Sequence, residues 1–280
     1  MSDLHTLHTL DGLGFAESLR WRGNELWFSD MFRGGVSAWN PDATSSVKLS
    51  HSDGGPEMPG GLGWTPDGDL LVVDCLKRLV LKLDQRETLS TYADLSTLTD
   101  YPLNDMHVDG DGTAWVGGYG FDPETETAVA SAIYQISPTG NISSSSAHFV
   151  FPNGCERYGD SLAIAETFSD RISFINDEHH VVKTFECSAG SGPDGLSFDA
   201  QGRLYVAMAF KGQIERFTLP GDSRLLYTLE PDVNYPGGPK GIFDCAVRSE
   251  NSTIAFSSAC LDEEYAKVNN TGSITIASLH

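Results

Sequence analysis

One sequence pattern occurs six times along the chain, and this repeat constrains the fold more than any other feature. Each copy has a short apolar run, a turn rich in Gly, Asp or Asn, and a second apolar run, as in GLGWTPDGDLLVVD over residues 61–74. The second runs begin at intervals of 44, 44, 48, 42 and 50 residues, at Leu26, Leu70, Ala114, Leu162, Leu204 and Ile254. Six units of about 45 residues therefore account for nearly all of the 280 residues.

Each unit predicts four short β-strands. In the second unit, further apolar runs follow over residues 79–83 and 88–92, and in the fifth unit over residues 213–219 and 225–229. Four antiparallel strands in a repeat of about 40–50 residues are typical of a β-propeller blade, which buries its faces against its neighbours. The sequence therefore predicts an all-β, six-bladed β-propeller with four antiparallel strands per blade, formed by residues 1–280 as one domain.

The last repeat is too short to supply a complete blade. Residues 273–277 would form its third strand, and residues 5–10 from the N-terminus would form its fourth. An N-terminal strand in that place would close the ring and remove two open sheet edges. Short helical patterns occur at residues 123–131 and 260–268, both within connections.

The composition excludes several classes of partner. The chain has 18 Lys and Arg against 39 Asp and Glu, a formal net charge of −21, which opposes binding to nucleic acids and to anionic membranes. No apolar run approaches the roughly 18 residues of a membrane-spanning helix, and the first ten residues lack the features of a signal peptide. We therefore expect a cytoplasmic protein whose five cysteines, none of them in a CxxC pair, are reduced thiols.

The predicted channel mouth carries side-chain oxygens. In a propeller, the innermost strand of each blade begins at one end of the central channel, and six residues occupy these positions in the repeat: Glu17, Gly61, Asn104, Asn153, Asp194 and Asp244. Five of the six carry side-chain oxygens and none is His or Cys, a donor set that suits a hard divalent cation. Glu17, Asn153 and Asp194 would bind Ca²⁺ first, or Mg²⁺, Mn²⁺ or Zn²⁺. Asp244, in the least regular repeat, is interpreted as a turn-capping residue.

The motifs around these positions resemble those of the senescence marker protein/gluconolactonase/luciferin-regenerating enzyme family. The resemblance rests on Phe15-Ala-Glu17, Leu103-Asn104-Asp105, Pro152-Asn153-Gly154 and Pro193-Asp194-Gly195, in this order and spacing. Members of this family are six-bladed propellers, and many are metal-dependent lactonases. The resemblance implies that Glu17, Asn153 and Asp194 bind the metal directly. It also implies that Asn104 contacts substrate or a bound water, and that Asp194 acts as general base.

One departure from the family pattern concerns the substrate. Sugar-lactone members carry an Arg two residues before the Asn that matches Asn104, and this chain has Pro102 there. The predicted mouth loops are aromatic instead, with Phe32, Tyr119, Phe121, Phe168, Phe210 and Tyr235. We therefore expect Asn104, Tyr119, Phe121, Phe168 and Phe210 to bind a lactone or ester that is less polar than gluconolactone.

Two other functions remain open on the same scaffold. The mouth could hold a small-molecule ligand without catalysis, or it could run a non-hydrolytic reaction of the strictosidine-synthase-like kind, which would need a catalytic Glu such as Glu156 or Glu166. Arg171 and Lys211, in the mouth loops, are either anion-binding residues or ordinary solvated charges. The partner expected in every case is a small molecule, bound by a monomer or a homodimer.

Overall fold

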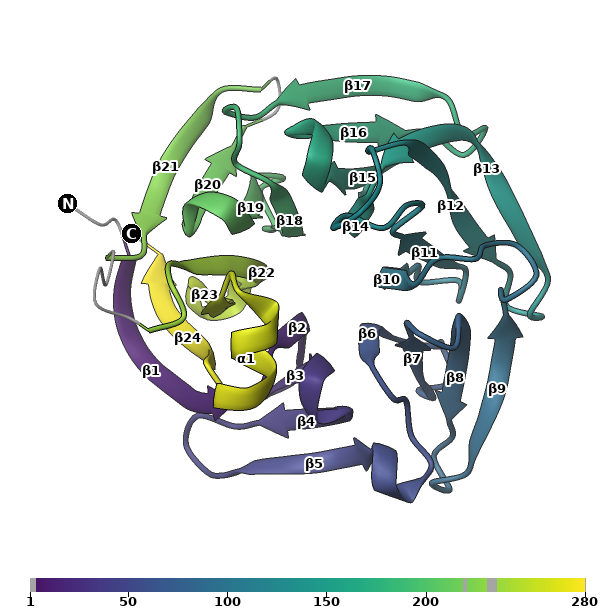
Figure 1. Ribbon diagram of the computed structural model, residues 1–280, viewed down its shortest axis with the longest axis horizontal. Helices are drawn as coiled ribbons and strands as arrows, with labels where there is room; N and C mark the ends of the chain where they lie inside the picture. The colour runs from purple at the N-terminus through teal and green to yellow at the C-terminus, as the bar shows by residue number, and fades with distance from the viewer. Residues whose placement is uncertain (1–3, 219–220, 231–235, 280) are drawn as a thin grey trace.

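The computed structural model describes residues 4–218, 221–230 and 236–279 as a ring of six sheets around a central channel (Figure 1). Each sheet has four antiparallel strands, and five of the sheets follow chain order from the innermost strand outward. The sixth sheet has the order β22-β23-β24-β1. This architecture is the six-bladed β-propeller that the repeat predicts.

The blades take up consecutive segments of the chain. The first contains β2 (Ala16–Arg22), β3 (Glu25–Asp30), β4 (Gly35–Trp39) and β5 (Ser45–Ser50). The second and third contain β6 (Pro59–Trp64), β7 (Leu70–Asp74), β8 (Leu79–Leu83), β9 (Leu89–Asp94), β10 (Leu103–Val108), β11 (Ala114–Gly118), β12 (Ala130–Ile136) and β13 (Ile142–Val150). The fourth and fifth contain β14 (Pro152–Tyr158), β15 (Ser161–Glu166), β16 (Arg171–Ile175), β17 (Val181–Glu186), β18 (Pro193–Phe198), β19 (Leu204–Met208), β20 (Gln213–Phe217) and β21 (Ser223–Thr228).

The sixth blade joins the two ends of the chain. It contains β22 (Lys240–Arg248), β23 (Thr253–Cys260) and β24 (Gly272–Leu279), and β1 (Leu4–Leu13) pairs antiparallel with β24 as the outermost strand. Figure 1 shows β1 lying along the outer edge of this blade. The predicted closure by the N-terminal strand is therefore confirmed, and pairing with β1 covers the edge that β24 would otherwise expose.

One of the two predicted helical segments is helical. α1 (Glu263–Asn269) begins after Asp262, whose side chain accepts a hydrogen bond from the amide of Tyr265 at 3.0 Å. The other predicted segment, 123–131, is not helical: residues 123–125 form a turn, residues 126–129 have no helical or strand structure, and residues 130–131 begin β12. The Asp122 carboxylate accepts from the amide of Glu124 at 3.0 Å and from the hydroxyl of Thr125 at 2.6 Å, and such local bonds compete with helix formation.

The innermost strand of every blade contains a β-bulge at the same level. Two residues of the inner strand face one residue of the second strand at 18–19, 60–61, 104–105, 153–154, 194–195 and 243–244. A bulge bends its strand and changes the direction of its side chains. The bulges therefore lie where the sequence predicts the site, at the level of Asn104, Asn153 and Asp194.

Two glycines allow the inner strands to approach one another there. A Cβ at Gly154 would lie 2.5 Å from the carbonyl oxygen of Asp194, and a Cβ at Gly195 would overlap the carboxylate of Asp244. Only glycine permits backbone contacts this close. This packing explains why Asn153 and Asp194 are each followed by Gly.

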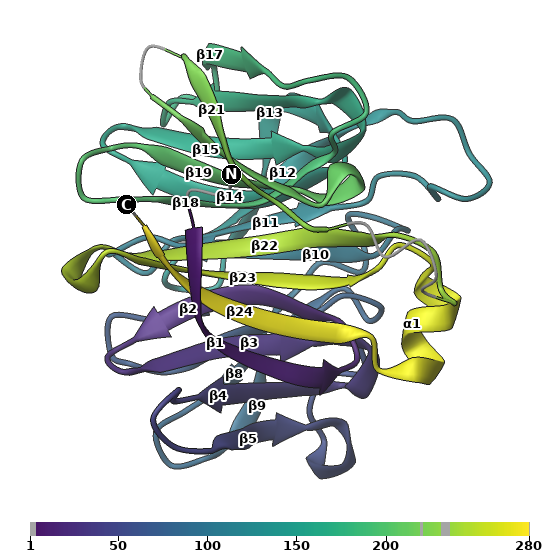
Figure 2. The same cartoon turned by 90° about the vertical axis from the view of Figure 1, so that its left-hand side faces the viewer.

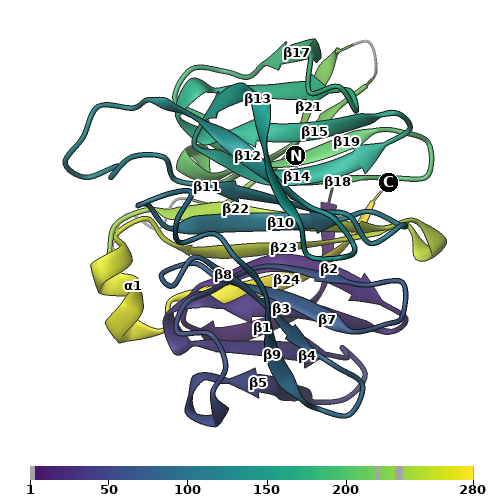
Figure 3. The same ribbon diagram turned by 90° about the vertical axis from the view of Figure 1, so that its right-hand side faces the viewer.

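One face of the ring carries the connections between second and third strands. They include the short 3-10 helices η1 (Met31–Arg33), η3 (Thr167–Ser169) and η4 (Ala209–Lys211), together with α1. Figures 2 and 3 show α1 and the β11–β12 connection projecting on this same side. η2 (His51–Asp53) follows β5, and η5 (Ser249–Asn251) joins β22 to β23. Within the described ranges, no helix has the length and apolar character needed to cross a membrane.

Candidate metal and catalytic site

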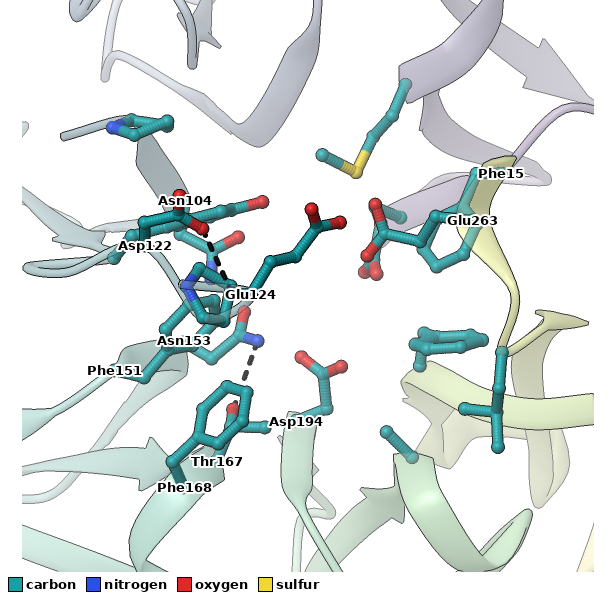
Figure 4. Close-up of a pocket in the computed structure, with 18 of the residues that line it drawn as sticks. Phe15, Asn104, Asp122, Glu124, Phe151, Asn153, Thr167, Phe168, Asp194 and Glu263 are labelled. Atoms are coloured by element: carbon teal, nitrogen blue, oxygen red, sulfur yellow. Dashed lines mark hydrogen bonds between the residues drawn. The ribbon is translucent and has the colours of Figure 1, made fainter. Parts of the chain in front are cut away.

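A pocket of about 710 Å³ occupies this face, at the end of the channel. The four predicted polar residues Glu17, Asn104, Asn153 and Asp194 all line it. The predicted aromatic residues Phe32, Tyr119, Phe121, Phe168 and Phe210 line it as well. Figure 4 shows Asn104, Asn153 and Asp194 around the inner part of the pocket. Tyr235 lies outside the described residues.

The strand register corrects the predicted equivalence of the six inner-strand positions. Asn104, Asn153 and Asp194 are equivalent, since each is the first residue of its bulge. Glu17 precedes its bulge by one residue, and Asp244 is the second residue of its own. The residue that follows Glu17, Ser18, has a φ of 52°, a left-handed conformation that non-glycine residues rarely adopt. Four oxygen-bearing side chains thus reach one pocket from two different register positions.

Asn153 is held by a short hydrogen-bond chain. Its amide nitrogen donates to the hydroxyl of Thr167 at 3.2 Å, and that hydroxyl donates to the carbonyl of Pro193 at 2.9 Å (Figure 4). All three residues are buried. Because the nitrogen is engaged by Thr167, the oxygen is the atom of this amide that could bind a cation. Thr167 is a site residue that sequence reasoning missed.

No Lys, Arg or His of the described residues lines the pocket beside Glu17 and Asp194. Burial raises the pKa of the Glu17 carboxyl well above its ordinary value, and repulsion from Asp194, Asp244 and Asp105 raises it further. Burial and repulsion from Asp244 and Asp105 likewise raise the pKa of Asp194, and the amide of Asn153 opposes this shift. The side chain of Asp194 is buried, and its Oδ1 has no hydrogen-bond partner among the residues that the structure describes. A cation bound between these groups would relieve both the repulsion and the unpaired oxygen.

The donor set fits a hard divalent cation. It combines the carboxylates of Glu17 and Asp194 with the amides of Asn153 and Asn104, all oxygen ligands of the kind that Ca²⁺ and Mg²⁺ prefer. No group of three or more His, Cys, Asp or Glu side chains in the described part of the chain is arranged to hold a metal ion. A metal bound here would therefore depend on amide oxygens as well as on carboxylates.

An ion cluster lies beneath these residues. Arg20 contacts the Asp105 carboxylate at 3.0 Å and the Asp244 carboxylate at 3.7 Å, and Asp244 also accepts a hydrogen bond from the amide of Leu19. Burial raises the pKa of Asp244 to about 7, although the charge of Arg20 opposes the rise. The interpretation of Asp244 as a turn residue is therefore wrong, because it lies within β22 and bridges two inner strands. A second pocket of about 340 Å³, lined by Arg20, His107 and Glu156, adjoins this cluster.

Aromatic rings form the walls of the main pocket. On one side, Tyr119 lies 4.5 Å from Phe151, Phe151 lies 5.0 Å from Phe168, and Phe168 lies 5.7 Å from Phe210, measured between ring centroids. On the other side, Phe15 lies 4.4 Å from Phe243 and 4.9 Å from Phe32. Sequence reasoning missed three of these rings. Phe15 and Phe151 each stand two residues before a site residue, and Phe243 directly precedes Asp244, so their places beside the motifs were an available signal.

The charged residues of the rim differ from the expected ones. The pocket is bordered by carboxylates that sequence reasoning missed, namely Asp122, Glu124, Asp262, Glu263 and Glu264. The two cations considered for anion binding are not among its lining residues. Arg171 pairs with Glu166 at 2.7 Å, and Lys211 donates to the hydroxyl of Ser188 at 2.8 Å. The rim is therefore acidic, and Arg171 and Lys211 have structural partners.

The cysteines are free thiols, as predicted. Cys155 and Cys245 are buried below the main pocket, where they line the second one. Burial raises the pKa of both thiols, so neither is activated as a nucleophile.

Solved structures with the same fold include enzymes and a calcium-binding protein. A luciferin-regenerating enzyme superposes with a TM-score of 0.74 at 16% identity, covering 96% of this chain and 92% of that chain. Regucalcin from Agrobacterium tumefaciens, described as a calcium-binding protein, gives a TM-score of 0.73 at 17% identity, with 98% and 93% covered. A gluconolactonase from Xanthomonas campestris gives 0.69 at 17% identity, with 98% and 88% covered. Identities this low establish the shared fold alone.

Sequence comparison assigns the family. A search of curated proteins found no match. Residues 15–232, which span the first five blades with their site residues, match the sequence pattern of the SMP-30/Gluconolactonase/LRE-like region. This match covers well over half of the chain, and it agrees with the fold and with the motifs around the pocket. The chain therefore belongs to the SMP-30/gluconolactonase/LRE-like family, a family of lactonase-like propellers.

Proposed function

We propose that this protein is a metal-dependent hydrolase that opens lactone rings, with Glu17, Asn153 and Asp194 holding one divalent cation. The observation that carries the proposal is the pair of mutually repelling carboxylates, Glu17 and Asp194, with the unpartnered Oδ1 of Asp194 at the inner end of a large pocket. Membership of a family that includes gluconolactonases supports ester hydrolysis as the reaction. The all-oxygen donor set favours Ca²⁺ over Zn²⁺.

Each polar residue has a role in this reaction. The bound cation would supply electrophilic assistance to the ester carbonyl and to the attacking water. Asp194 takes a proton from the attacking water, and the oxygen of that water attacks the carbonyl carbon. Asn104 orients the substrate by hydrogen bonding. The ring C–O bond then breaks, and the departing alkoxide takes up the proton that Asp194 had accepted, which gives the hydroxy acid and restores the carboxylate. Thr167 acts as a positioning residue, because it holds the amide of Asn153.

The walls favour a substrate less polar than a sugar lactone. Pro102 lines the pocket at the position where sugar-lactone members carry Arg, and it offers no side-chain hydrogen bond. Phe168 and Phe210 remain 41% and 42% exposed, so apolar surface is available to a bound alkyl or aryl group. Burying that surface would add about 25 cal/mol per Å² of apolar area to binding.

The test is a lactone panel. Protein stripped of metal by a chelator is assayed for acid release in a pH-stat, against γ- and δ-lactones with alkyl or hydroxylated rings, before and after addition of Ca²⁺, Mg²⁺, Mn²⁺ or Zn²⁺. We expect hydrolysis that returns with the metal and is faster for alkyl lactones. Equal or faster turnover of sugar δ-lactones would contradict the preference for apolar substrates.

The same panel decides between hydrolysis and the alternatives. Tight metal binding without turnover of any ester would favour a ligand-binding propeller over an enzyme. A strictosidine-synthase-like reaction is less well supported, because Glu166 does not line the pocket and is engaged by Arg171, Ser173 and the amide of Val150. Glu156 lines the second pocket and is not among the residues that line the main one.

A further inference from the structure

The main pocket has an unusual combination of lining residues. Seven of its lining side chains are carboxylates and nine are aromatic, counting Glu17 and Asp194 among the carboxylates. No Lys, Arg or His lines it among the residues that the structure describes. A pocket for a neutral sugar lactone would need neither this number of rings nor this much negative charge.

The rim carboxylates face into the pocket. Glu124 comes from the β11–β12 connection and Glu263 from α1, and Figure 4 shows both side chains extending toward the centre of the pocket from opposite sides. Burial raises the pKa of Glu263, and repulsion from Glu124 and Glu264 adds to the rise, while Lys267 opposes it. Both carboxylates therefore contribute negative charge to the same part of the pocket.

One cationic side chain of the protein, Lys267, contacts the rim without lining the pocket. The ammonium of Lys267 contacts the Glu264 carboxylate at 2.5 Å and lies 5.4 Å from the ring centroid of Phe32. An ammonium group is therefore already placed against one pocket ring and one rim carboxylate. Lys267 offsets only part of the rim charge, since five carboxylates border the mouth.

We infer that the pocket selects esters and lactones whose apolar body carries a positively charged ammonium group. The inference rests on the proposed hydrolysis for the reaction and on the rim and walls for the substrate. The ammonium would lie between Glu124 and Glu263, against the faces of the aromatic walls, with the ester group directed toward Asn104 and Asp194. A cation near aromatic rings and carboxylates is stabilised by both, whereas an anionic substrate would be repelled.

The net negative charge of the whole molecule also favours a cationic substrate. A net charge of −21 attracts cations over long distances and raises their rate of encounter with an acidic mouth. Such steering weakens with ionic strength, because salt screens charges beyond about 10 Å at 0.1 M. A cationic substrate should therefore lose kcat/KM as salt is added, and a neutral one should not.

The experiment compares two γ-lactones of the same shape on the metal-loaded protein. One carries a side chain ending in trimethylammonium and the other ends in tert-butyl. We expect kcat/KM to be about tenfold higher for the cationic lactone at low salt. Equal or higher kcat/KM for the tert-butyl lactone would overturn the inference while leaving lactone hydrolysis intact.

Variants assign the preference to the rim. Glu124→Gln and Glu263→Gln should each reduce the preference for the cationic lactone over the tert-butyl lactone about threefold. Lys267→Gln should increase this preference, because the removed charge has the opposite sign. Glu178→Gln, in the exposed β16–β17 turn, is the matched control and should leave it unchanged. An unchanged preference in both rim variants would also overturn the inference.

A binding measurement separates this inference from the reaction. Calorimetry with benzyltrimethylammonium should detect binding to the wild-type protein and binding weaker by about tenfold in the Glu124→Gln, Glu263→Gln double variant. Binding with no turnover of either lactone would support the cation site and reject the hydrolysis. Equal binding by both proteins would reject the cation site whatever the outcome of the hydrolysis assay.

Discussion

Asp194 lines the main pocket in an environment that is unfavourable for its charge. The residue is 5% exposed, its carboxylate lies near other buried carboxylates, and one carboxylate oxygen has no hydrogen-bond partner in the described part of the chain. Buried like charges destabilise a fold unless a counter-charge binds between them. We therefore regard Asp194 as a residue that lowers the stability of the metal-free protein and makes cation binding favourable.

Asp194→Asn separates these two effects. The substitution removes the buried charge, so the metal-free protein should gain about 0.5–2 kcal/mol in free energy of unfolding, measured by urea titration. The same variant should lose about 100-fold or more in lactone hydrolysis, because the proton acceptor is gone. Asp111→Asn, in an exposed turn at the opposite end of the channel, should change neither quantity by much. A destabilised metal-free Asp194→Asn protein would contradict the account of this residue.

At the scale of elements, the turns at the opposite end of the channel link neighbouring blades. Asp109, in the β10–β11 turn, accepts hydrogen bonds from Arg157 of β14 at 2.7 Å and from Trp115 at 2.8 Å, and contacts His107 at 3.2 Å. Burial alone would raise the pKa of Asp109, but the bonds from His107, Arg157 and Trp115 lower it to about 2. This carboxylate thus ties the third blade to the fourth.

The stabilisation by Asp109 should depend on pH. Because its folded pKa lies below the unfolded value of 3.8, its contribution is present above about pH 4 and is lost as the pH falls toward 2. Asp109→Asn should therefore cost about 1–3 kcal/mol at pH 7 and progressively less below pH 4, in urea unfolding followed by fluorescence. A cost that stays constant between pH 7 and pH 3 would contradict this. Asp111→Asn in the same turn serves as the control, because Asp111 is exposed and accepts a hydrogen bond from the backbone amide of Thr113 within its own turn.

The elements were predictable from the sequence where local patterns determine them. Each hairpin joins two apolar runs through a Gly- or Asp-containing turn, so the strand positions followed from the repeat. The bulges did not follow, because contacts between neighbouring inner strands fix them, as at Gly195 against Asp244. That is why the sequence placed Glu17 and Asp244 at the same register as Asn153. The segment 123–131 was misassigned for a different reason, since Asp122 forms side-chain bonds that a helical pattern does not reveal.

At the scale of the whole molecule, the ring depends on the pairing of β1 with β24. Deleting residues 1–10 would leave β24 as an open edge and should lower the melting temperature and promote association that rises with protein concentration. Deleting residues 1–3 alone is the control, because it retains every described pair between β1 and β24, from Leu4 to Leu13. Unchanged melting and a monodisperse product after the longer deletion would show that closure by β1 is dispensable.

The whole-molecule arrangement also explains what could be predicted about the pocket. The inner-strand motifs placed Asn104, Asn153 and Asp194 together because the ring repeats their position around one axis. The acidic rim could not be found in this way. Glu124 lies in the β11–β12 connection and Glu263 in the β23–β24 connection, 139 residues apart in the sequence. Neither connection belongs to the repeat, so only the folded ring brings them to one mouth.

Metal binding coupled to hydrolysis tests the central claim most directly. Calorimetric titration of chelator-treated protein with Ca²⁺ is paired with pH-stat assays of alkyl lactones on the same samples, for the wild type and for Asp194→Asn and Asp111→Asn. We predict one bound ion per chain, a melting temperature raised by binding, and hydrolysis that appears in proportion to the bound ion in the wild type and in Asp111→Asn, but not in Asp194→Asn. Hydrolysis of the same rate in the metal-free wild type, or undiminished metal binding and turnover in Asp194→Asn, would contradict it.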